Sequence, residues 1–459
     1  MSFPRYPKYK ASGVEWLGEV PEHWEVCALR RITLSMCDGP FGSGLKSEHY
    51  SDHGVRVVRL QNIKPMRFDG TDAAYIDHTY CKRELGDHYV IAEDVLVAGL
   101  GDENNTVGRA CVAPASIGLA LVKADCFRFR LVSELAIADF VAAALTTSSP
   151  FAAGTLATGS TRSRISLSET ATRLIPLPPL AEQRAIAAFL DRETKKIDEL
   201  VAEQERLIEL LKEKRQAVIS HAVTKGLDPA APMKPSGVEW LGDVPAHWNV
   251  VPLRHLMRLT SGGTPNRENR DYWDGAIPWA SSKDLKSEEL FDTQEHVTER
   301  ALRDGRVELV PVGSILTVVR GMILLHTFPV VVARVPTAIN QDLKAILPTE
   351  GISSDFMAWL LRGASDEVLR RTDEAGHGTK VLRMEAWLAM CVAVPPLDEQ
   401  AGICRRIADQ LSALDELLKQ AESAISLLTE RRSALISAAV TGQIDVRNAV
   451  PGANPTEAA

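Results

Sequence analysis

Apolar residues recur at every seventh position in two long stretches of the chain, and charged residues fill most of the positions between them. A narrow apolar stripe with this period predicts a helix that packs along a partner helix as a coiled coil. The predicted packing residues are Ile186, Leu190, Ile197, Leu200, Leu207, Leu211 and Val218 in the first stretch and Ile403, Ile407, Leu414, Leu417, Leu428 and Leu435 in the second.

The two stretches are near copies of each other, without an insertion or deletion between Pro178–Thr224 and Pro395–Thr441. Both open with Pro-Pro-Leu-x-Glu-Gln, and proline is tolerated in the first turn of a helix. Gly226 and Gly442 lie just past the two ends, where glycine readily adopts a left-handed cap. About 45 residues at 1.5 Å each give a helix of roughly 65 Å. Two unrelated surface helices would not explain a repeat of constant length.

A second repeat precedes each globular segment. The run Ser12–Trp24, which begins Ser-Gly-Val-Glu-Trp-Leu-Gly, returns as Ser236–Trp248. We expect the tryptophans to pin this motif to the domain that follows it. His23 and His247 have no evident acid partner within the motif, so the sequence does not favour a catalytic role for either.

The segments 25–177 and 249–394 carry short β-like runs separated by turn signals, with few long helices. This pattern predicts mixed α/β domains. The expected strands lie at 55–60, 94–97, 126–131, 314–320 and 330–334, and the expected helices at 136–145 and 356–371.

The resulting fold class is α/β, with two globular domains that alternate with two long helices. Matched helices beside divergent globular domains fit a protein that reads two different targets at a set distance. The predicted order is a repeat segment at 1–24, a globular domain at 25–177, a helix at 178–226, a linker and second repeat segment at 227–248, a globular domain at 249–394, a helix at 395–442 and a disordered tail at 443–459.

Composition limits the classes of protein to which the chain can belong. A chain of 459 residues is too long for one core, and its 45% hydrophobic and 24% charged residues are typical of a soluble globular protein. No apolar run approaches the ~20 residues of a membrane span, and the N-terminus lacks the apolar core of a signal peptide. Seven scattered cysteines predict reduced thiols in a cytoplasmic protein. The net charge of −8 argues against non-specific coating of DNA, but not against local basic patches.

The sequence contains no recognisable catalytic signature. There is no phosphate-binding loop and no zinc-binding His-Glu-x-x-His helix, and neither Pro-Pro pair has the flanking residues of an adenine methyltransferase motif. Glu193-Thr194-Lys195 has a nuclease-like spacing but falls on the polar face of the predicted helix. No carboxylate or cysteine completes a metal set with His49 and His53. We therefore predict no catalytic or metal site.

The remaining candidates suit DNA reading. Arg and Lys distinguish guanine, Asn and Gln distinguish adenine, and Ser and Thr contact phosphates. Polar loops with these residues occur at comparable places in both globular segments. The candidate contacts are Ser43, Lys46, Arg59, Gln61, Asn62, Lys64, Arg162 and Arg164 in the first segment and Thr264, Asn266, Arg267, Ser282, Lys283, Asn340, Gln341, His377, Thr379 and Lys380 in the second.

Over nearly its whole length the chain resembles the specificity subunit of type I restriction-modification enzymes. The duplicated Ser-Gly-Val-Glu-Trp-Leu-Gly segment and the Pro-Leu-x-Glu-Gln runs at 179–183 and 396–400 carry the resemblance. The starts of the two globular segments add to it, namely Asp38-Gly39-Pro40-Phe41-Gly42-Ser43 and Gly262-Gly263-Thr264-Pro265 followed by Tyr272-Trp273 and Ile277-Pro278-Trp279.

The resemblance implies two target-recognition domains, each of which reads one half of a split double-stranded DNA sequence. It implies that the two helices pack antiparallel as the spacer, with pseudo-two-fold symmetry. It also implies two modification subunits, which bring S-adenosylmethionine and methylate adenine N6, and restriction/translocase subunits that use ATP and Mg. The specificity subunit of such a complex binds no cofactor and has no active site of its own.

Two other classes of protein account for fewer of these features. An autonomous DNA-modifying enzyme requires a carboxylate cluster or a cofactor loop that the sequence does not show. A coiled-coil adaptor explains the helices but not two large, divergent globular domains. A fusion of the recognition module to a methylase would leave no room for two recognition domains in 459 residues.

Overall fold

The computed structural model describes residues 3–40, 44–155, 163–375 and 378–449. The chain divides into two compact units, which are described separately. Unit 1 comprises Met1–Gln204 and Ala424–Ala459, and unit 2 comprises Glu205–Ser423. Each unit therefore contains one globular domain and a part of both long helices.

The two predicted long helices are confirmed as α5 (Leu180–Lys225) and α10 (Leu397–Val440), each of which begins directly after its proline pair. Each helix is followed closely by a glycine with a left-handed backbone, Gly226 with φ of 75° and Gly442 with φ of 73°. This conformation is one that glycine adopts without a steric penalty.

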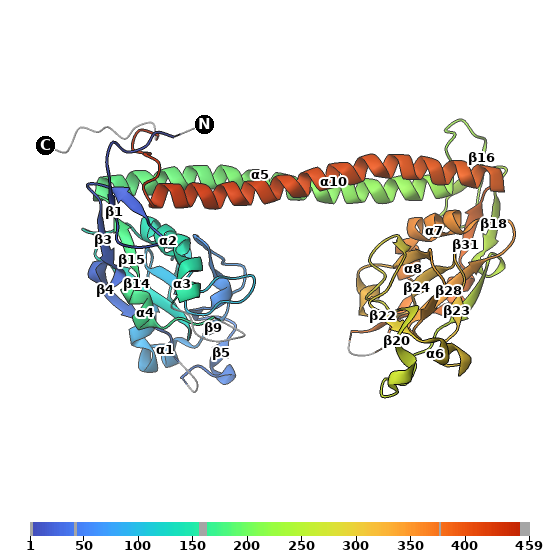
Figure 1. The fold of residues 1–459 in the computed structure, drawn as a ribbon, viewed down its shortest axis with the longest axis horizontal. Helices are drawn as coiled ribbons and strands as arrows, with labels where there is room; N and C mark the ends of the chain where they lie inside the picture. Colours follow the sequence, from blue (N-terminus) through green and yellow to red (C-terminus); the bar gives the residue numbers. More distant parts are fainter. Residues whose placement is uncertain (1–2, 41–43, 156–162, 376–377, 450–459) are drawn as a thin grey trace. The chain divides into compact units, whose positions relative to one another are not determined.

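The helices run antiparallel, as expected (Figure 1). In unit 1 Nε of Arg432 on α10 lies 3.0 Å from Oδ1 of Asp198 on α5. In unit 2 Nε of Arg215 on α5 lies 3.3 Å from Oδ1 of Asp415 on α10. The residue number therefore rises along one helix while it falls along the other. The two Arg–Asp pairs occupy matching positions of the repeat, so equivalent ion pairs join the helices in both units.

The buried seam between the helices differs in some positions from the prediction. Ile186, Leu190, Ile197, Leu211, Ile403 and Ile407 are buried, and Val218, Leu414, Leu428 and Leu435 are half-buried. Leu200, Leu207 and Leu417, by contrast, are 45%, 41% and 46% exposed.

Each helix contributes two rows of side chains to the seam. One of these rows lies one residue further along each helix than predicted. Two apolar rows lie side by side on each helix, and packing against the partner helix decides which of them is covered. The observed row consists of Val201, Ile208 and Arg215 on α5 and Leu411, Leu418, Ile425 and Arg432 on α10.

The globular part of unit 1 contains two main sheets. The first has the strand order β10 (Tyr89–Val90), β13 (Ala120–Val122), β6 (Val55–Val58), β9 (Tyr75–Ile76) and β5 (Tyr50–Ser51). The second has the order β12 (Ala110–Val112), β11 (Val95–Ala98), β14 (Cys126–Leu131) and β4 (Thr33–Cys37). Two-stranded pairs form from β1 (Tyr9–Ala11) and β2 (Glu19–Pro21), β3 (Glu25–Ala28) and β15 (Leu174–Leu177), and β7 (Ile63–Lys64) and β8 (Arg67–Phe68). The helices are α1 (His78–Glu84), α2 (Ala138–Thr147), α3 (Ser149–Thr155) and α4 (Leu167–Thr172).

Unit 2 repeats this arrangement. One sheet has the order β19 (Met257–Ser261), β28 (Leu343–Pro348), β24 (Ile315–Val318), β26 (Val330–Ala333) and β21 (Glu289–Leu290). Another has the order β22 (Glu295–Val297), β20 (Trp273–Ala280), β27 (Thr337–Ile339) and β23 (Leu309–Val310). Smaller sheets form from β16 (Met233–Pro235) and β17 (Asp243–Pro245), β18 (Asn249–Pro252) and β31 (Cys391–Val394), and β25 (Arg320–Gly321), β30 (Lys380–Leu382) and β29 (Thr372–Glu374). The helices are α6 (Glu299–Arg303), α7 (Ser354–Gly363), α8 (Ser365–Leu369) and α9 (Met384–Leu388).

The two globular domains share one strand order although their residues differ. The run β12-β11-β14-β4 of unit 1 corresponds to β26-β24-β28-β19 of unit 2, and β10-β13-β6-β9 corresponds to β23-β27-β20-β22. In both domains a glycine lies where the chain that follows β4 or β19 passes close to the backbone at the end of β13 or β27. A Cβ on Gly39 would lie 2.1 Å from the carbonyl carbon of Lys123, and one on Gly262 would lie 2.0 Å from the carbonyl oxygen of Ile339. Only glycine fits so close to another backbone, which explains the glycines at the two domain starts.

Two further details of the prediction are wrong. The expected helix 356–371 is two helices, because α7 ends at Gly363, where a Cβ would lie 2.7 Å from Cγ2 of Val223 on α5. The described part of the expected disordered tail, residues 443–449, belongs to the fold of unit 1. Val446 is fully buried there, and the Asp445 N–H donates to the Pro4 carbonyl at 2.8 Å.

A buried glutamine attaches each globular domain to the start of a long helix. Oε1 of Gln183 accepts from the Ile137 N–H at 2.9 Å, and its Nε2 donates to the carbonyls of Leu135 (3.0 Å) and Pro178 (2.8 Å). Ile137 is the residue that precedes α2. All three polar contacts of this side chain are therefore made to the backbone.

Gln400 repeats these contacts in unit 2. Its Oε1 accepts from the Ser353 N–H at 2.9 Å, and its Nε2 donates to the carbonyls of Gly351 (2.9 Å) and Pro395 (3.0 Å). The glutamate beside each glutamine holds the second repeat motif, since His23 Nε2 lies 2.8 Å from Glu182 and His247 Nε2 lies 2.8 Å from Glu399. These contacts explain the Pro-Leu-x-Glu-Gln run.

We expect Gln400→Ala to loosen the domain of unit 2 from its helix, because it leaves buried backbone groups unpaired at a cost of about 1–3 kcal/mol. Denaturant unfolding would measure the loss of stability, and hydrogen exchange at the Ser353 amide would locate it. Gln420→Ala is the matched control, because Gln420 lies on the same helix and is exposed. Equal exchange rates at Ser353 in both variants would contradict the assignment.

Candidate nucleic-acid interface

In unit 2 several of the predicted contact residues come together at one end of the sheet that contains β20 and β27. The Gly263 N–H donates to the Ile339 carbonyl at 2.9 Å, and the Asn340 N–H donates to the Ala280 carbonyl at 3.0 Å. The Thr264 hydroxyl donates to Oε1 of Gln341. The loops after β19, β20 and β27 therefore form one cluster, and its exposed or half-exposed predicted residues are Thr264, Asn266, Arg267, Ser282, Lys283 and Gln341.

Two tryptophans hold the loop that carries Arg267. Nε1 of Trp279 donates to the Gly263 carbonyl at 3.0 Å, and Nε1 of Trp273 donates to the Asn266 carbonyl at 3.1 Å. The guanidinium of Arg267 lies over the Trp273 ring, 4.0 Å from its centroid, and pairs with Glu295. The aromatic residues of this predicted motif thus fix the loop backbone and orient the arginine.

In unit 1 the predicted residues lie on the segment around the short 3-10 helix Leu60–Asn62 and the strand β7. Arg59 pairs with Asp72, Gln61 is exposed and Lys64 is half-buried. Nδ2 of Asn62 donates to the carbonyls of Asp69 and Asp72, both at 2.8 Å.

Two predicted base contacts, Asn62 and Asn340, face the interior instead. Asn62 is fully buried, and its Oδ1 accepts from the Arg59 N–H at 2.8 Å. Asn340 is 8% exposed, and its Oδ1 accepts from the N–H groups of Asp342 and Leu343, both at 3.1 Å. Asparagine commonly closes tight loops in this way, so both side chains shape the loops on which other candidates lie.

Arg109 is a residue of this region that the sequence did not indicate. Its side chain is buried, and burial lowers its pKa. Nε donates to the Ile63 carbonyl at 2.7 Å, Nη2 to the Leu60 carbonyl at 3.0 Å and Nη1 to the Leu100 carbonyl at 3.2 Å. A single guanidinium thus joins the segment that carries Gln61 and Lys64 to the loop after β11.

Asp38 organises the neighbouring loops of unit 1. Its Oδ1 accepts from the Gly39 N–H at 2.7 Å and from the Asp125 N–H at 3.0 Å. Asp125 in turn pairs with the predicted contact residue Arg164, with Nη2 and Oδ1 2.8 Å apart. Desolvation by burial raises the pKa of Asp38 to about 6.

The other candidates lie elsewhere or outside the described residues. Lys46 is exposed beside Glu48, with Nζ 3.7 Å from its carboxylate. Lys380 begins β30, Thr379 precedes it, and both are half-buried. Nζ of Lys380 lies 3.5 Å from the Glu374 carboxylate. Ser43, Arg162 and His377 fall outside the described residues.

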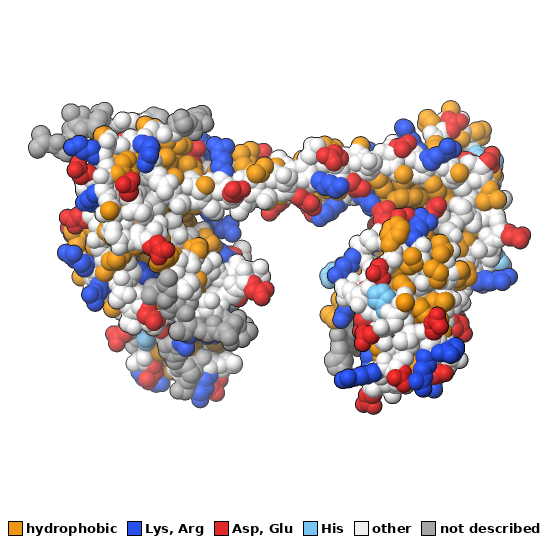
Figure 2. Space-filling model, in the orientation of Figure 1, with side chains coloured by type: hydrophobic (Ala, Val, Ile, Leu, Met, Phe, Trp, Pro, Cys, Tyr) orange, Lys and Arg blue, Asp and Glu red, His pale blue; other side chains and the backbone are white. Residues whose placement is uncertain are grey.

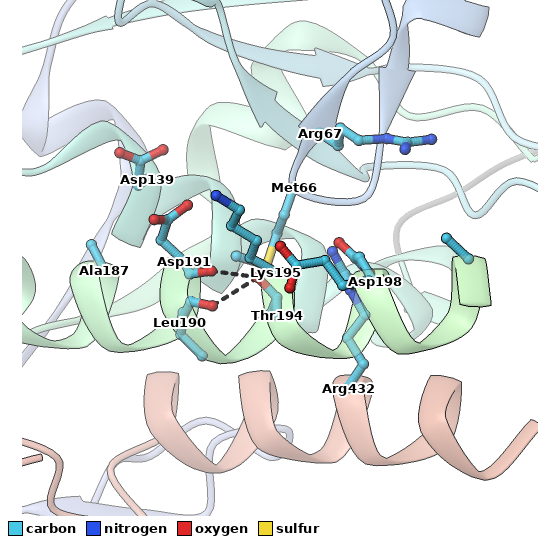
Figure 3. Close-up of a pocket in the computed structure, with 12 residues that line it drawn as sticks. Met66, Arg67, Asp139, Ala187, Leu190, Asp191, Thr194, Lys195, Asp198 and Arg432 are labelled. Carbon is cyan, nitrogen blue, oxygen red and sulfur yellow. Dashed lines mark hydrogen bonds and ion pairs between the residues drawn. The ribbon is translucent and has the colours of Figure 1, made fainter. Parts of the chain in front are cut away.

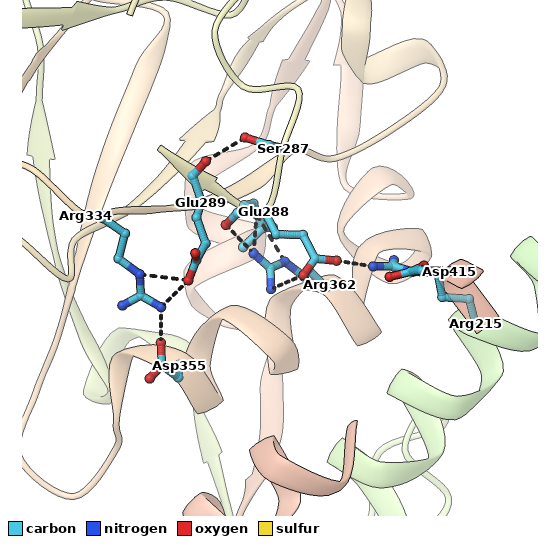
Figure 4. A network of polar contacts seen from close by, with 9 residues as sticks. Arg215, Ser287, Glu288, Glu289, Arg334, Asp355, Arg362 and Asp415 are labelled. Atoms are coloured by element: carbon cyan, nitrogen blue, oxygen red, sulfur yellow. Dashed lines mark hydrogen bonds and ion pairs between the residues drawn. The ribbon is translucent and has the colours of Figure 1, made fainter. Parts of the chain in front are cut away.

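In unit 2 an ionic network joins the globular domain to the helix pair (Figure 4). The Glu288 carboxylate pairs with Arg215 of α5 and with Arg362 of α7, whose Nη1 lies 3.6 Å away. Next to it, Nη2 of Arg334 lies 3.0 Å from Asp355. These pairs lie beside the Arg215–Asp415 link between the helices.

The corresponding place in unit 1 is a cavity of about 510 Å³ (Figure 3). Met66 and Arg67 of the β7–β8 hairpin line it on one side, and residues of α5 such as Asp191 and Lys195 line it on the other. Unit 2 has a cavity of about 670 Å³ at the matching place, lined by Arg215, Glu288 and Asp415. The two units therefore differ in the residues that line this cavity and not in whether one is present.

Charges of both signs are interspersed over the visible face of each unit (Figure 2). The predicted contact arginines that the structure describes are paired with carboxylates, namely Arg59 with Asp72, Arg164 with Asp125 and Arg267 with Glu295. In the part of the chain that the structure describes, no three His, Cys, Asp or Glu side chains are placed to hold a metal, and no helix is long and apolar enough to cross a membrane.

Comparison with known proteins identifies a consistent set of relatives. The chain is 27% identical over 259 residues to the EcoR124I/EcoR124II type I restriction enzyme specificity subunit of Escherichia coli, a match that covers 55% of this chain and 58% of that one. It is 23% identical over 454 residues to the EcoKI specificity subunit of E. coli strain K12, a match that covers 93% of this chain and 90% of that one. The chain thus spans less than two thirds of the first relative and nine tenths of the second.

A solved chain gives the same fold. It comes from a study of complex assembly and conformational transition in a type I R-M system, and it matches with a TM-score of 0.67 at 14% identity, over 92% of this chain and 98% of that one. No protein-family model matches the chain.

We predict that Asp38 makes unit 1 more stable at acid pH. The Asp38 pKa of about 6 lies above its ordinary value of 3.8, so between these values the folded state binds more protons and stability falls as pH rises. The melting temperature of the wild type minus that of Asp38→Asn should therefore be larger near pH 4.5 than near pH 7.5. Thermal melts of both chains across this range would test the sign, and a difference that does not vary with pH would contradict it.

Proposed function

We propose that this chain, a relative of the specificity subunits of type I restriction enzymes, recognises a bipartite DNA sequence with one globular domain per half-site. The observation that carries the proposal is the pair of domains with one strand order and different loop residues. Each is mounted on the helix pair by the same glutamine contacts. A shared scaffold with divergent loops suits two readers of different sequences, because loops on a rigid scaffold carry binding specificity.

The loop clusters of the two domains contact the DNA. Exposed side chains such as Gln61 in unit 1 and Arg267 and Gln341 in unit 2 are of the types that read base edges. Because α5 and α10 run through both units, their length sets the number of unread base pairs between the half-sites.

Catalysis belongs to partner subunits in this proposal. Modification subunits bring S-adenosylmethionine and methylate adenine N6 at both half-sites, and restriction subunits use ATP and Mg. The exposed leucines of the long helices, Leu200 in unit 1 and Leu207 and Leu417 in unit 2, offer apolar surface to such partners. Large exposed side chains of this kind commonly mark interaction sites when they gather in patches.

The first test is a methylation map. The chain is co-expressed with its modification subunit in a host free of DNA methylation, and N6-methyladenine is located by long-read sequencing. We expect a bipartite motif with one methylated adenine in each half, absent when the chain is omitted. Replacement of residues 249–394 by another recognition domain should change one half only. Methylation by the chain alone would show that it is an enzyme, and a stable complex that leaves no motif would favour an adaptor.

The second test changes the helix length. Insertion of one helical turn into both α5 and α10 lengthens each by about 5.4 Å, roughly the length of one or two base pairs. We expect the same two half-sites with a longer spacer in the methylation map. An insertion in one helix only is the control, because it breaks the matched register and should reduce methylation. Changed half-sites would show that the helices take part in base reading.

A further inference from the structure

Arg267 is held on several sides and yet remains accessible. Its Nη2 lies 2.9 Å from Oε2 of Glu295, and Nη1 contacts Oε1, so the pair is bidentate. The guanidinium carbon lies 4.0 Å from the centroid of Trp273 and 5.1 Å from that of Trp279. Even so, the Arg267 side chain is 53% exposed and that of Glu295 is 44% exposed.

The backbone under Arg267 is equally constrained. The two indole N–H groups bind the carbonyls of Gly263 and Asn266, and the Trp273 and Trp279 rings pack edge to face with centroids 5.1 Å apart. The guanidinium is therefore oriented before any ligand arrives. Binding through a preorganised side chain costs less conformational entropy than binding through a free one.

The charge balance of the site favours a base edge over a phosphate. Glu295 neutralises Arg267, and the hydrogen bond from Arg267 lowers the pKa of Glu295. The adjoining cavity of about 550 Å³ is lined by residues of both charge types, including Arg270 and Asp274. A phosphate contact gains affinity from unbalanced positive charge, whereas base reading depends on directed donors and acceptors.

The two side chains match the edge of one base pair. The planar fork of arginine binds O6 and N7 of guanine, and a carboxylate accepts from N4 of cytosine. Arg267 pairs with Glu295 through its terminal nitrogens, which leaves Nε and the outer N–H groups for guanine.

We propose that Arg267 and Glu295 together read one G·C base pair in the half-site bound by unit 2. Arg267 binds the guanine, and Glu295 orients Arg267 and accepts from the cytosine amino group. This inference rests on the proposed function, since it assigns residues to one position of the bipartite sequence.

The test uses Arg267→Lys in the complex with the modification subunit. Lysine keeps the charge but loses the fork. We expect one G·C position in the unit 2 half of the methylated motif to become degenerate, with discrimination reduced about 10-fold or more. The unit 1 half and the melting temperature should not change.

Glu295→Gln separates orientation from charge. Glutamine no longer pairs with Arg267, so the same G·C position of the motif should lose discrimination. Binding to DNA without the motif should become tighter and more salt-dependent, because Arg267 is no longer neutralised. A merely structural role would lower the melting temperature and leave the salt dependence unchanged.

The matched control is Arg300→Lys. Arg300 is 55% exposed in the same unit and pairs with Asp271, but among the described residues its contacts are to carboxylates and not to an indole ring. This variant should keep the wild-type motif.

The outcomes distinguish the role of Arg267 from the proposed function of the chain. Retained discrimination in Arg267→Lys, or an equal loss in both half-sites, overturns the role of Arg267 while leaving the proposed function in place. A wild-type chain that directs no methylation overturns the proposed function and this inference with it.

Discussion

The attachment of each globular domain depends on one buried glutamine at the start of a long helix. Gln183 and Gln400 bind only backbone N–H and C=O groups, two in the domain that each holds and one at the proline pair before its own helix. Backbone groups are present whatever the side chains are, so the same clamp can mount domains of different sequence. The clamp also satisfies the N–H of the residue that precedes α2 or α7, and an unpaired buried group there would cost free energy. Because of this choice of contact, the two domains can carry different loops while the contacts that attach them to the helices stay the same.

Much of the fold could be predicted because it follows from local pattern. The seven-residue period, the proline starts and the terminal glycines placed α5 and α10 within two residues of their observed ends. Some seam positions were predicted a single residue away from the observed row, because two apolar rows lie side by side on each helix. Only packing against the partner shows that Val201 and Ile208 are more buried than Leu200 and Leu207.

The candidate site was less predictable because its contacts join distant segments of the chain. Residue type suggested Asn62 and Asn340 as base contacts, but the same amide chemistry makes asparagine a good loop anchor, and both are buried. Asp72 and Glu295 could not be paired with Arg59 and Arg267 from sequence, since the loops between them have no periodic signal. Arg109 gave no signal either, because its partners are carbonyl groups that every residue carries.

The carboxylate partners also reconcile the acidic charge of the chain with the proposed reading of DNA. A protein that binds DNA through free cations holds every sequence with similar strength, because phosphates are the same everywhere. An arginine neutralised and oriented by a carboxylate, as Arg267 is by Glu295, gains little from phosphates and much from a base edge of the right geometry. With a net charge of −8, a chain with the proposed function would discriminate between sequences, and the proposed partner subunits would supply the general affinity for DNA.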